Sequence, residues 1–195
     1  DLAEVLEMIE PYVKPGVTTG ELDRICHDHI TNKQQAISAC LGYHGYPKSV
    51  CISINEVVCH GIPKKEDVLK AGDIVNVDMT LDYKGYYGDA SRMFIIGETT
   101  PEKEQLVRVT KECLDLGAEA AKPYGFLGDI GHAIQQHAEK YGYGDSGECI
   151  TIADKKEVWQ LEMFGSGPGK PSAIWVAQRV PDDHVGISAN IPRIS

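Results

Sequence analysis

The chain has 195 residues, a net charge of −10 and 42% hydrophobic residues. This length suits one ordinary domain or one domain with a small appendage, and the spread of Val, Ile and Leu excludes a disordered protein. The 29 acidic residues outnumber the 19 basic ones, and no concentrated basic patch is present, so we expect no nucleic-acid partner. No apolar run reaches the roughly 18 residues needed to cross a membrane.

The six cysteines form no Cys-x-x-Cys pair, and several lie among apolar residues. This usage favours reduced thiols and a cytoplasmic location, although the six could also pair as disulfides. Residue 1 is Asp and falls within an amphipathic pattern. We therefore expect the numbering to begin inside a longer protein.

The first 63 residues predict two helices followed by loops and short strands. Apolar residues recur at helical spacing from position 2 to 9, and Thr18 with Glu21 forms a capping-box pattern that opens a second helix. Residues 39–63 are rich in Gly, Pro, Tyr and β-branched residues, which predicts loops with short strands at 49–54 and before His60.

The rest of the chain predicts a hairpin, two helices and a β-rich end. Strands are expected at 74–82 and 86–96, joined at Lys84-Gly85, followed by a helix from Pro101 to about residue 121. Asp129 is expected to cap a shorter helix that reaches residue 140. Residues 150–195 have no helical period. Apolar and polar residues alternate at 159–163, and strand-like runs follow at 173–180 and 184–189, so the predicted class is α+β.

The hairpin carries two aspartates, Asp78 and Asp89, inside otherwise apolar strands, where Asp is a poor strand former. Their odd separation places both on one face if the loop has an even number of residues, and on opposite faces if it does not. On one face they would be opposed or diagonal, about 4.5–8 Å apart. Such a carboxylate pair could hold divalent metals if other residues completed the site, or it could simply face water beside the turn.

The histidines differ in their sequence context. His60 precedes Gly61, where a substrate could approach closely, so it is a candidate functional group. His44 lies in a Gly- and Tyr-rich loop that suits either a pocket wall or a turn. His27 and His29 are two apart on the second predicted helix, and we expect both at the surface.

Three segments resemble bacterial type I methionine aminopeptidases. They read Leu-Gly-Tyr-His-Gly-Tyr-Pro at 41–47, Ile-Asn-Glu-Val-Val-Cys-His-Gly-Ile-Pro at 54–63, and the aspartate hairpin from 73 to 89. The resemblance runs from residue 1 to about 140. It implies the first half of a pita-bread fold and a metallopeptidase that removes the initiator methionine from nascent proteins.

The same resemblance assigns roles to individual residues. Asp78 and Asp89 would be ligands of two divalent metal ions, chosen from Mn, Fe, Co and Zn, and His60 would be a catalytic residue that contacts the substrate. The methionine pocket would be lined by four residues, namely Cys40, Tyr43, His44 and Tyr46. The partner implied is the N-terminus of a peptide or nascent protein.

The family pattern stops after Lys140, and the His and Glu segments that complete its metal site are absent. Residues 141–195 instead resemble an internal piece of cysteine-nucleophile dipeptidases, of the N-terminal-nucleophile class, with Asn190 near a possible oxyanion site. We therefore expect a chimeric or composite chain with domains at 1–140 and 141–195. Little peptidase activity is expected from these residues alone. The alternatives are a dipeptidase of that class and a non-catalytic peptide-binding remnant.

Overall fold

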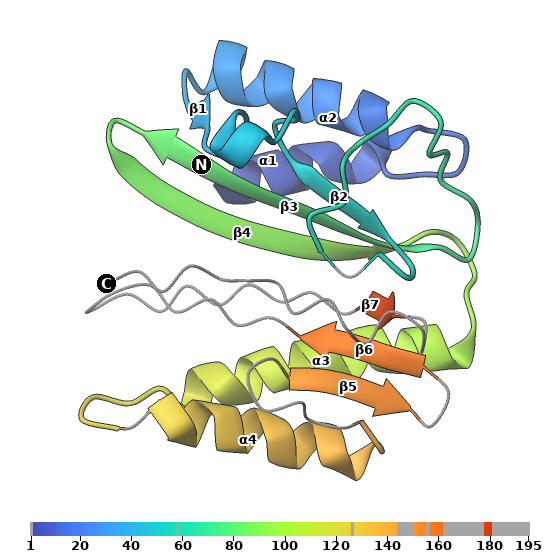
Figure 1. Ribbon diagram of the computed structural model, residues 1–195, viewed down its shortest axis with the longest axis vertical. Helices are drawn as coiled ribbons and strands as arrows, with labels where there is room; N and C mark the ends of the chain where they lie inside the picture. The colour runs from blue at the N-terminus through green and yellow to red at the C-terminus, as the bar shows by residue number, and fades with distance from the viewer. Residues whose placement is uncertain are drawn as a thin grey trace.

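The computed structural model describes residues 2–57, 59–125 and 127–143, together with the backbone of three later strands at 150–154, 157–161 and 178–180. The fold is α+β, as predicted (Figure 1). Helices α1 (Leu2–Ile9) and α2 (Thr19–Asp28) cover one face of an antiparallel sheet, and α3 (Pro101–Ala120) and α4 (Leu127–Lys140) lie on its other side. Short helical turns follow α1 and α2 at Glu10–Tyr12 and His29–Lys33.

The sheet is built around one long hairpin. Strand β3 (Ile74–Tyr83) pairs along its whole length with β4 (Tyr86–Ile95). Its opposite edge is shared by two short strands, β1 (Ile37–Ser38) and β2 (Cys51–Ile54). The hairpin agrees with the sequence prediction, whereas β1 was not predicted, because two residues are too few to show an alternating pattern.

The helix boundaries follow local capping. The Thr18 side chain accepts a hydrogen bond from the Glu21 N–H at 3.1 Å, and Thr100 accepts one from the Lys103 N–H at 3.4 Å. Both helices therefore begin where their capping patterns predict. Asp129 was wrongly expected to be the cap of α4. It lies within the first turn instead, where its charge complements the helix dipole.

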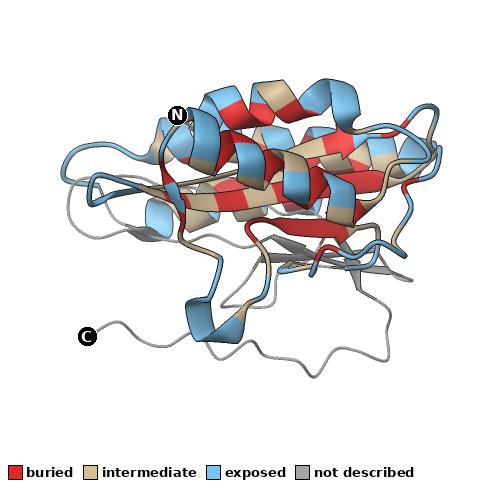
Figure 2. Cartoon of the chain, turned by 90° about the horizontal axis from the view of Figure 1, so that it is seen from above, coloured by how far each residue is buried: buried red, intermediate tan, exposed pale blue. Residues whose placement is uncertain are grey.

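Two hydrophobic clusters hold the described elements together. The larger one joins α1 and α2 to alternate residues of β3, among them Val75, Val77 and Met79, which are fully buried (Figure 2). The smaller one packs α3 against α4 and includes Ile74 at the start of β3. Because side chains alternate along a strand, Asp78 and Thr80 point to the face opposite the larger cluster.

The expectation that His27 and His29 lie at the surface was wrong. His29 is 7% exposed and its Nε2 lies 3.2 Å from Glu4 Oε1, while His27 is half-buried with its Nδ1 hydrogen-bonded to Ser49 Oγ at 2.7 Å. Helical spacing gives the direction of a side chain but not what covers it, and here α1 and the loop before β2 supply the cover.

Three strands follow residue 143: β5 (Ile150–Asp154), β6 (Glu157–Leu161) and β7 (Gln178–Val180). They pair antiparallel in that order. Strand β6 overlaps the alternating pattern at 159–163, and β7 falls within the strand predicted at 173–180, whereas no separate strand was predicted at β5. The strand predicted at 184–189 lies outside the described residues. None of the helices in the described part is long and apolar enough to cross a membrane.

Candidate active site

The β3–β4 hairpin places Asp78 and Asp89 on one face of the sheet. Asp89 is paired with Thr80, two residues from Asp78, so the two aspartates are diagonal neighbours. The loop is the two-residue turn Lys84-Gly85, whose φ angles of 55° and 82° suit a tight hairpin. An even loop was the condition that the odd spacing required, and the structure satisfies it.

Both carboxylates are held away from bulk solvent. Their Oδ1 atoms are buried, and that of Asp89 accepts no hydrogen bond within the described residues. Burial raises the pKa of Asp89, against the opposing effects of a hydrogen bond from Thr80 and the charge of His60. A buried carboxylate oxygen without a donor is stabilised when a cation binds it, and carboxylates are ligands of divalent metals. These residues therefore fit a metal.

The two aspartates need further ligands. Across residues 2–57, 59–125 and 127–143, no group of three or more His, Cys, Asp or Glu side chains is placed to hold a metal ion. The sequence had already indicated that two side chains cannot complete a dinuclear site. Asn190, the predicted oxyanion residue of the last segment, lies outside the described residues.

His60 does not follow a strand, contrary to the sequence prediction. It is exposed, with a left-handed φ of 54°, in a long loop whose only bridge in the described part joins Val68 to Thr18. Gly61 fixes this segment: its carbonyl accepts the Ile52 N–H at 2.9 Å and its own N–H donates to Ser53 Oγ at 3.1 Å. The apolar run before His60 resembles a strand, but Val57 closes a turn, with its N–H donating to the Ile54 carbonyl at 3.0 Å.

The predicted pocket residues occupy the loop between β1 and β2. Tyr43 is 64% exposed, and its ring lies edge-to-face with His44, whose own φ is 46°. Tyr46 turns inward, where its hydroxyl donates to the carbonyls of Val50 and Gly61 at 3.1 and 3.0 Å. Tyr46 therefore ties the pocket loop to the segment that carries His60.

Cys40 lies beside a second thiol that the sequence analysis did not select. Its side chain shares a hydrogen bond with Cys51, which lowers the pKa of Cys40 to about 7 despite its burial. The same hydrogen bond, followed by burial, raises the pKa of Cys51. Cys51 pairs with Asp78 across β2 and β3. Its place at the start of the strand predicted at 49–54 was the only sequence feature that could have identified it.

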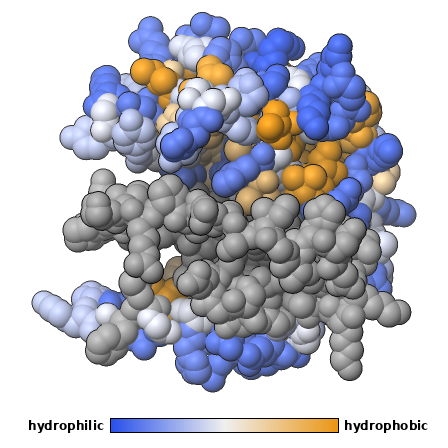
Figure 3. Space-filling model, in the orientation of Figure 1, coloured by the Kyte–Doolittle hydropathy of each residue, from blue (hydrophilic) through white to orange (hydrophobic). Residues whose placement is uncertain are grey.

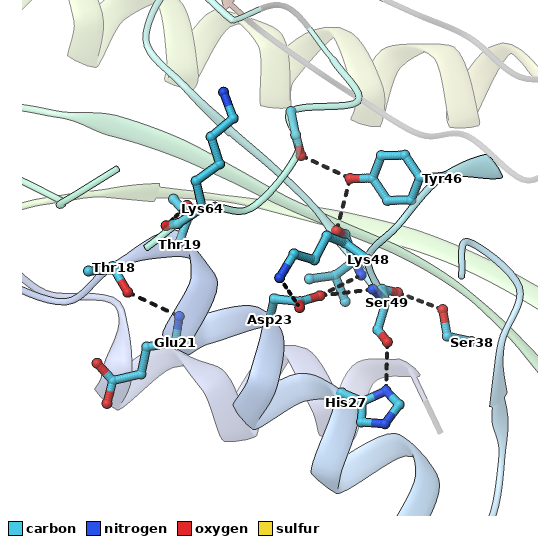
Figure 4. A network of polar contacts seen from close by, with 12 residues as sticks. Thr18, Thr19, Glu21, Asp23, His27, Ser38, Tyr46, Lys48, Ser49 and Lys64 are labelled. Carbon is cyan, nitrogen blue, oxygen red and sulfur yellow. Dashed lines mark hydrogen bonds and ion pairs between the residues drawn. The ribbon is translucent and has the colours of Figure 1, made fainter. Parts of the chain in front are cut away.

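A polar network anchors the pocket loop to α2 (Figure 4). The Asp23 carboxylate accepts the N–H groups of Ser49 and Val50 at 2.8 and 3.3 Å and lies 3.4 Å from Lys48 Nζ. Ser49 also bonds His27 through its hydroxyl, and its carbonyl accepts the Ser38 hydroxyl at 2.7 Å. Ser49 is buried and its histidine has no carboxylate partner in this network, so the cluster is an anchor and not a nucleophile.

A groove of 520 Å³ borders this region. Its walls come from β2 and the loop that follows, including Ile52, Ile54, Gly61 and Ile62. Figure 3 shows hydrophobic residues gathered on this part of the surface. The groove adjoins the His60 segment through Gly61, while the two aspartates do not line it.

The α+β fold and the diagonal carboxylate pair define a protein with a candidate metal site on the open face of an antiparallel sheet. The chain belongs to metallopeptidase family M24, whose family model matches residues 2–165. The fold is the first half of the pita-bread fold of that family, followed by a β-rich segment.

Methionine aminopeptidases are prominent among its relatives. The enzyme of Salmonella typhimurium is 65% identical over 141 residues, which is 72% of this chain and 53% of that protein. The crystal structure of methionine aminopeptidase from Rickettsia prowazekii matches with a TM-score of 0.73 at 36% identity, covering 93% of this chain and 83% of that one. The chain spans about half the length of the curated relatives it matches.

More distant structures share only the fold. A Xaa-Pro dipeptidase from Bacillus anthracis matches with a TM-score of 0.64 at 17% identity, covering 90% of this chain and 52% of that one. The family match runs past residue 140 to residue 165. The comparisons therefore do not support a chimera joined to a cysteine-nucleophile dipeptidase at that point.

Proposed function

We propose that this chain carries one half of the active site of a type I methionine aminopeptidase, which removes the initiator methionine from peptides and nascent proteins in the cytoplasm. One observation carries the proposal: Asp78 and Asp89 are diagonal neighbours on one sheet face, and the buried Oδ1 of Asp89 has no hydrogen-bond donor among the residues that the structure describes. The 65% identity to an enzyme of that name supports the same activity.

Asp78 and Asp89 would hold two divalent ions, drawn from Mn, Fe, Co and Zn. When bound, such ions polarise the scissile carbonyl and lower the pKa of water. The further ligands would come from outside residues 2–143. We also propose domains at 1–140 and 141–195, a division supported by the change from helices to paired strands after α4 ends at Lys140.

His60 would contact the substrate beside the scissile peptide, because the loop projects it from the segment that Gly61 fixes to β2. Cys40, Tyr43, His44 and Tyr46 would line the methionine pocket. The inward Tyr46 hydroxyl donates to the Gly61 carbonyl, and this hydrogen bond would hold the pocket wall at a fixed position relative to His60.

Calorimetric titration of the 195-residue chain with Mn²⁺ tests the metal ligands directly. Asp89→Asn removes a charged ligand, so we expect a loss of affinity of at least about tenfold, the lower end of what loss of a metal-site partner costs. Asp115→Asn, a change at an exposed helix carboxylate, is the matched control and should bind Mn²⁺ as the parent does. Equal affinity in the parent and in Asp89→Asn would contradict the proposal.

The same chain should release little methionine from a Met-Gly-x peptide, because the described residues supply only two ligands. Release at ordinary enzyme rates would overturn this expectation. Peptide binding without turnover, unchanged by Asp78→Ala, would favour the binding remnant. Metal-independent cleavage that alkylation abolishes would favour the dipeptidase.

A further inference from the structure

Two thiols meet at a break along one edge of β3. Strand β1 pairs with the residues at 81–82 and β2 with those at 75–78, so the chain leaves this edge after β1 and returns to it at β2. Ala39 still donates to the Thr80 carbonyl at 2.9 Å, which places Cys40 at the point of departure. Cys51 is the first residue of β2, and its thiol shares a hydrogen bond with that of Cys40.

The two thiols differ in their access to solvent. Cys40 is half-buried, whereas Cys51 is only 6% exposed. Cys26 and Cys113 are fully buried, each in a different hydrophobic cluster, and so lie apart from this pair. A reagent in solution therefore reaches Cys40 first, with Cys51 next to it as the second thiol.

We propose that Cys40 and Cys51 form a reversible redox modification site, which a low-molecular-weight disulfide such as oxidised glutathione converts into a disulfide across the base of the pocket loop. Cys40 directly follows Ala39, which bonds Thr80, and Cys51 joins the same edge of β3 opposite Asp78, so the two cysteines are neighbours along one strand edge, as a disulfide requires. The proposal requires neither a metal nor a peptide, so it stands independently of the proposed function.

The exchange proceeds in two balanced steps. The Cys40 thiolate attacks one sulfur of oxidised glutathione, which forms a mixed disulfide and releases one glutathione thiolate. The Cys51 thiolate then attacks the Cys40 sulfur and displaces the second glutathione. The two cysteines lose two electrons and two protons, and one glutathione disulfide is reduced to two glutathione thiols.

The disulfide would link the two ends of the loop formed by residues 41–50. Gly42, His44 and Gly45 all have left-handed φ angles, and no neighbouring atom lies within 4 Å of where a Cβ on either glycine would stand. A link from Cys40 to Cys51 would close this loop covalently and remove both thiols from its base. Cytoplasmic disulfides are usually transient in this way, so reduction should reverse the change.

The test is to incubate the folded, reduced 195-residue chain with oxidised glutathione, alkylate the free thiols and map the peptides. Tryptic peptides 34–48 and 49–64 should become joined, with the loss of both Cys40 and Cys51 from the alkylated products. Because peptide 49–64 also contains Cys59, fragmentation must place the link at Cys51. Dithiothreitol should restore both thiols.

Single variants separate the two steps. Cys51→Ser should accumulate glutathione on Cys40, and Cys40→Ser should show no link and no adduct on the buried Cys51. Cys59→Ser is the matched control and should form the link as the parent does. A glutathione adduct that persists on Cys40 of the parent without resolution, a link to Cys59, or no reaction at Cys40 would each overturn the proposal. If a variant does not fold, peptide mapping of the oxidised parent chain alone decides whether Cys40 and Cys51 form the disulfide.

Discussion

The hairpin and the loop from residue 39 to residue 61 both contribute residues to the candidate site, but they are held in place in different ways. Asp78 and Asp89 are positioned by a continuous ladder and a two-residue turn, all within 22 consecutive residues of β3, the turn and β4. The loop instead depends on partners far along the chain, such as Asp23 and Ser49, 26 residues apart. Local geometry is sufficient for the first region, whereas the second requires the assembled fold.

The largest expected effect comes from removing the anchor of the loop. Asp23→Ala leaves the buried N–H groups of Ser49 and Val50 without their acceptor, which should lower the free energy of unfolding by about 3 kcal/mol. Urea unfolding followed by circular dichroism measures this change. Asp28→Ala, an exposed position near the end of the same helix, is the control and should change stability by less than about 1 kcal/mol. Equal effects would mean that the loop does not depend on Asp23.

Gly61→Ala should have the next largest effect, because the added Cβ would overlap the Ile52 carbonyl oxygen. We expect a loss of about 2 kcal/mol from overpacking against backbone, together with faster amide exchange at Ile52. Gly128→Ala, with open space around its Cβ, should be neutral or stabilising. A stable Gly61→Ala with unchanged exchange would show that the His60 segment is not fixed here.

Gly85→Ala tests the hairpin turn, where only local backbone strain opposes the added methyl group. The φ of this residue is +82° and no atom lies within 4 Å of the added Cβ, so we expect a loss of about 1 kcal/mol from the left-handed backbone alone. Thermal unfolding gives the magnitude. If Gly85→Ala cost more than Gly61→Ala, the contrast between the two regions would be reversed.

The smallest expected effect is a pH dependence at the α3–α4 contact. A hydrogen bond from His137, followed by one from Arg108, lowers the pKa of the half-buried Glu112 carboxyl. A lowered folded-state pKa means that this contribution is present above the ordinary pKa of 4.5 and is lost as the pH falls through the folded value. The free energy of unfolding of the parent should therefore exceed that of Glu112→Gln by a small, constant amount above pH 4.5, and acid titration should show this difference shrinking as the pH falls further. A difference that grows above that pH would contradict this sign.

The successes and errors of the sequence analysis follow the same contrast. The helices α1 to α4 and the hairpin were predicted because capping residues, hydrophobic periodicity and turn chemistry act over a few residues. The errors involve His29, His60 and the unselected Cys51, whose surroundings are supplied by distant segments. His29 was expected at the surface because the sequence does not show that Glu4 would cover it.

The sequence by itself determined the α+β class and the capped starts of α2 and α3. With a two-residue turn, it also determined that Asp78 and Asp89 lie on one face of the sheet. Those features depend on backbone geometry that repeats every two or 3.6 residues. Only the tertiary structure decided that Asp89 Oδ1 is buried, that Tyr46 bridges to Gly61, and that Cys40 meets Cys51. Burial and hydrogen bonding between separate segments depend on how the chain packs, and no local pattern encodes that packing.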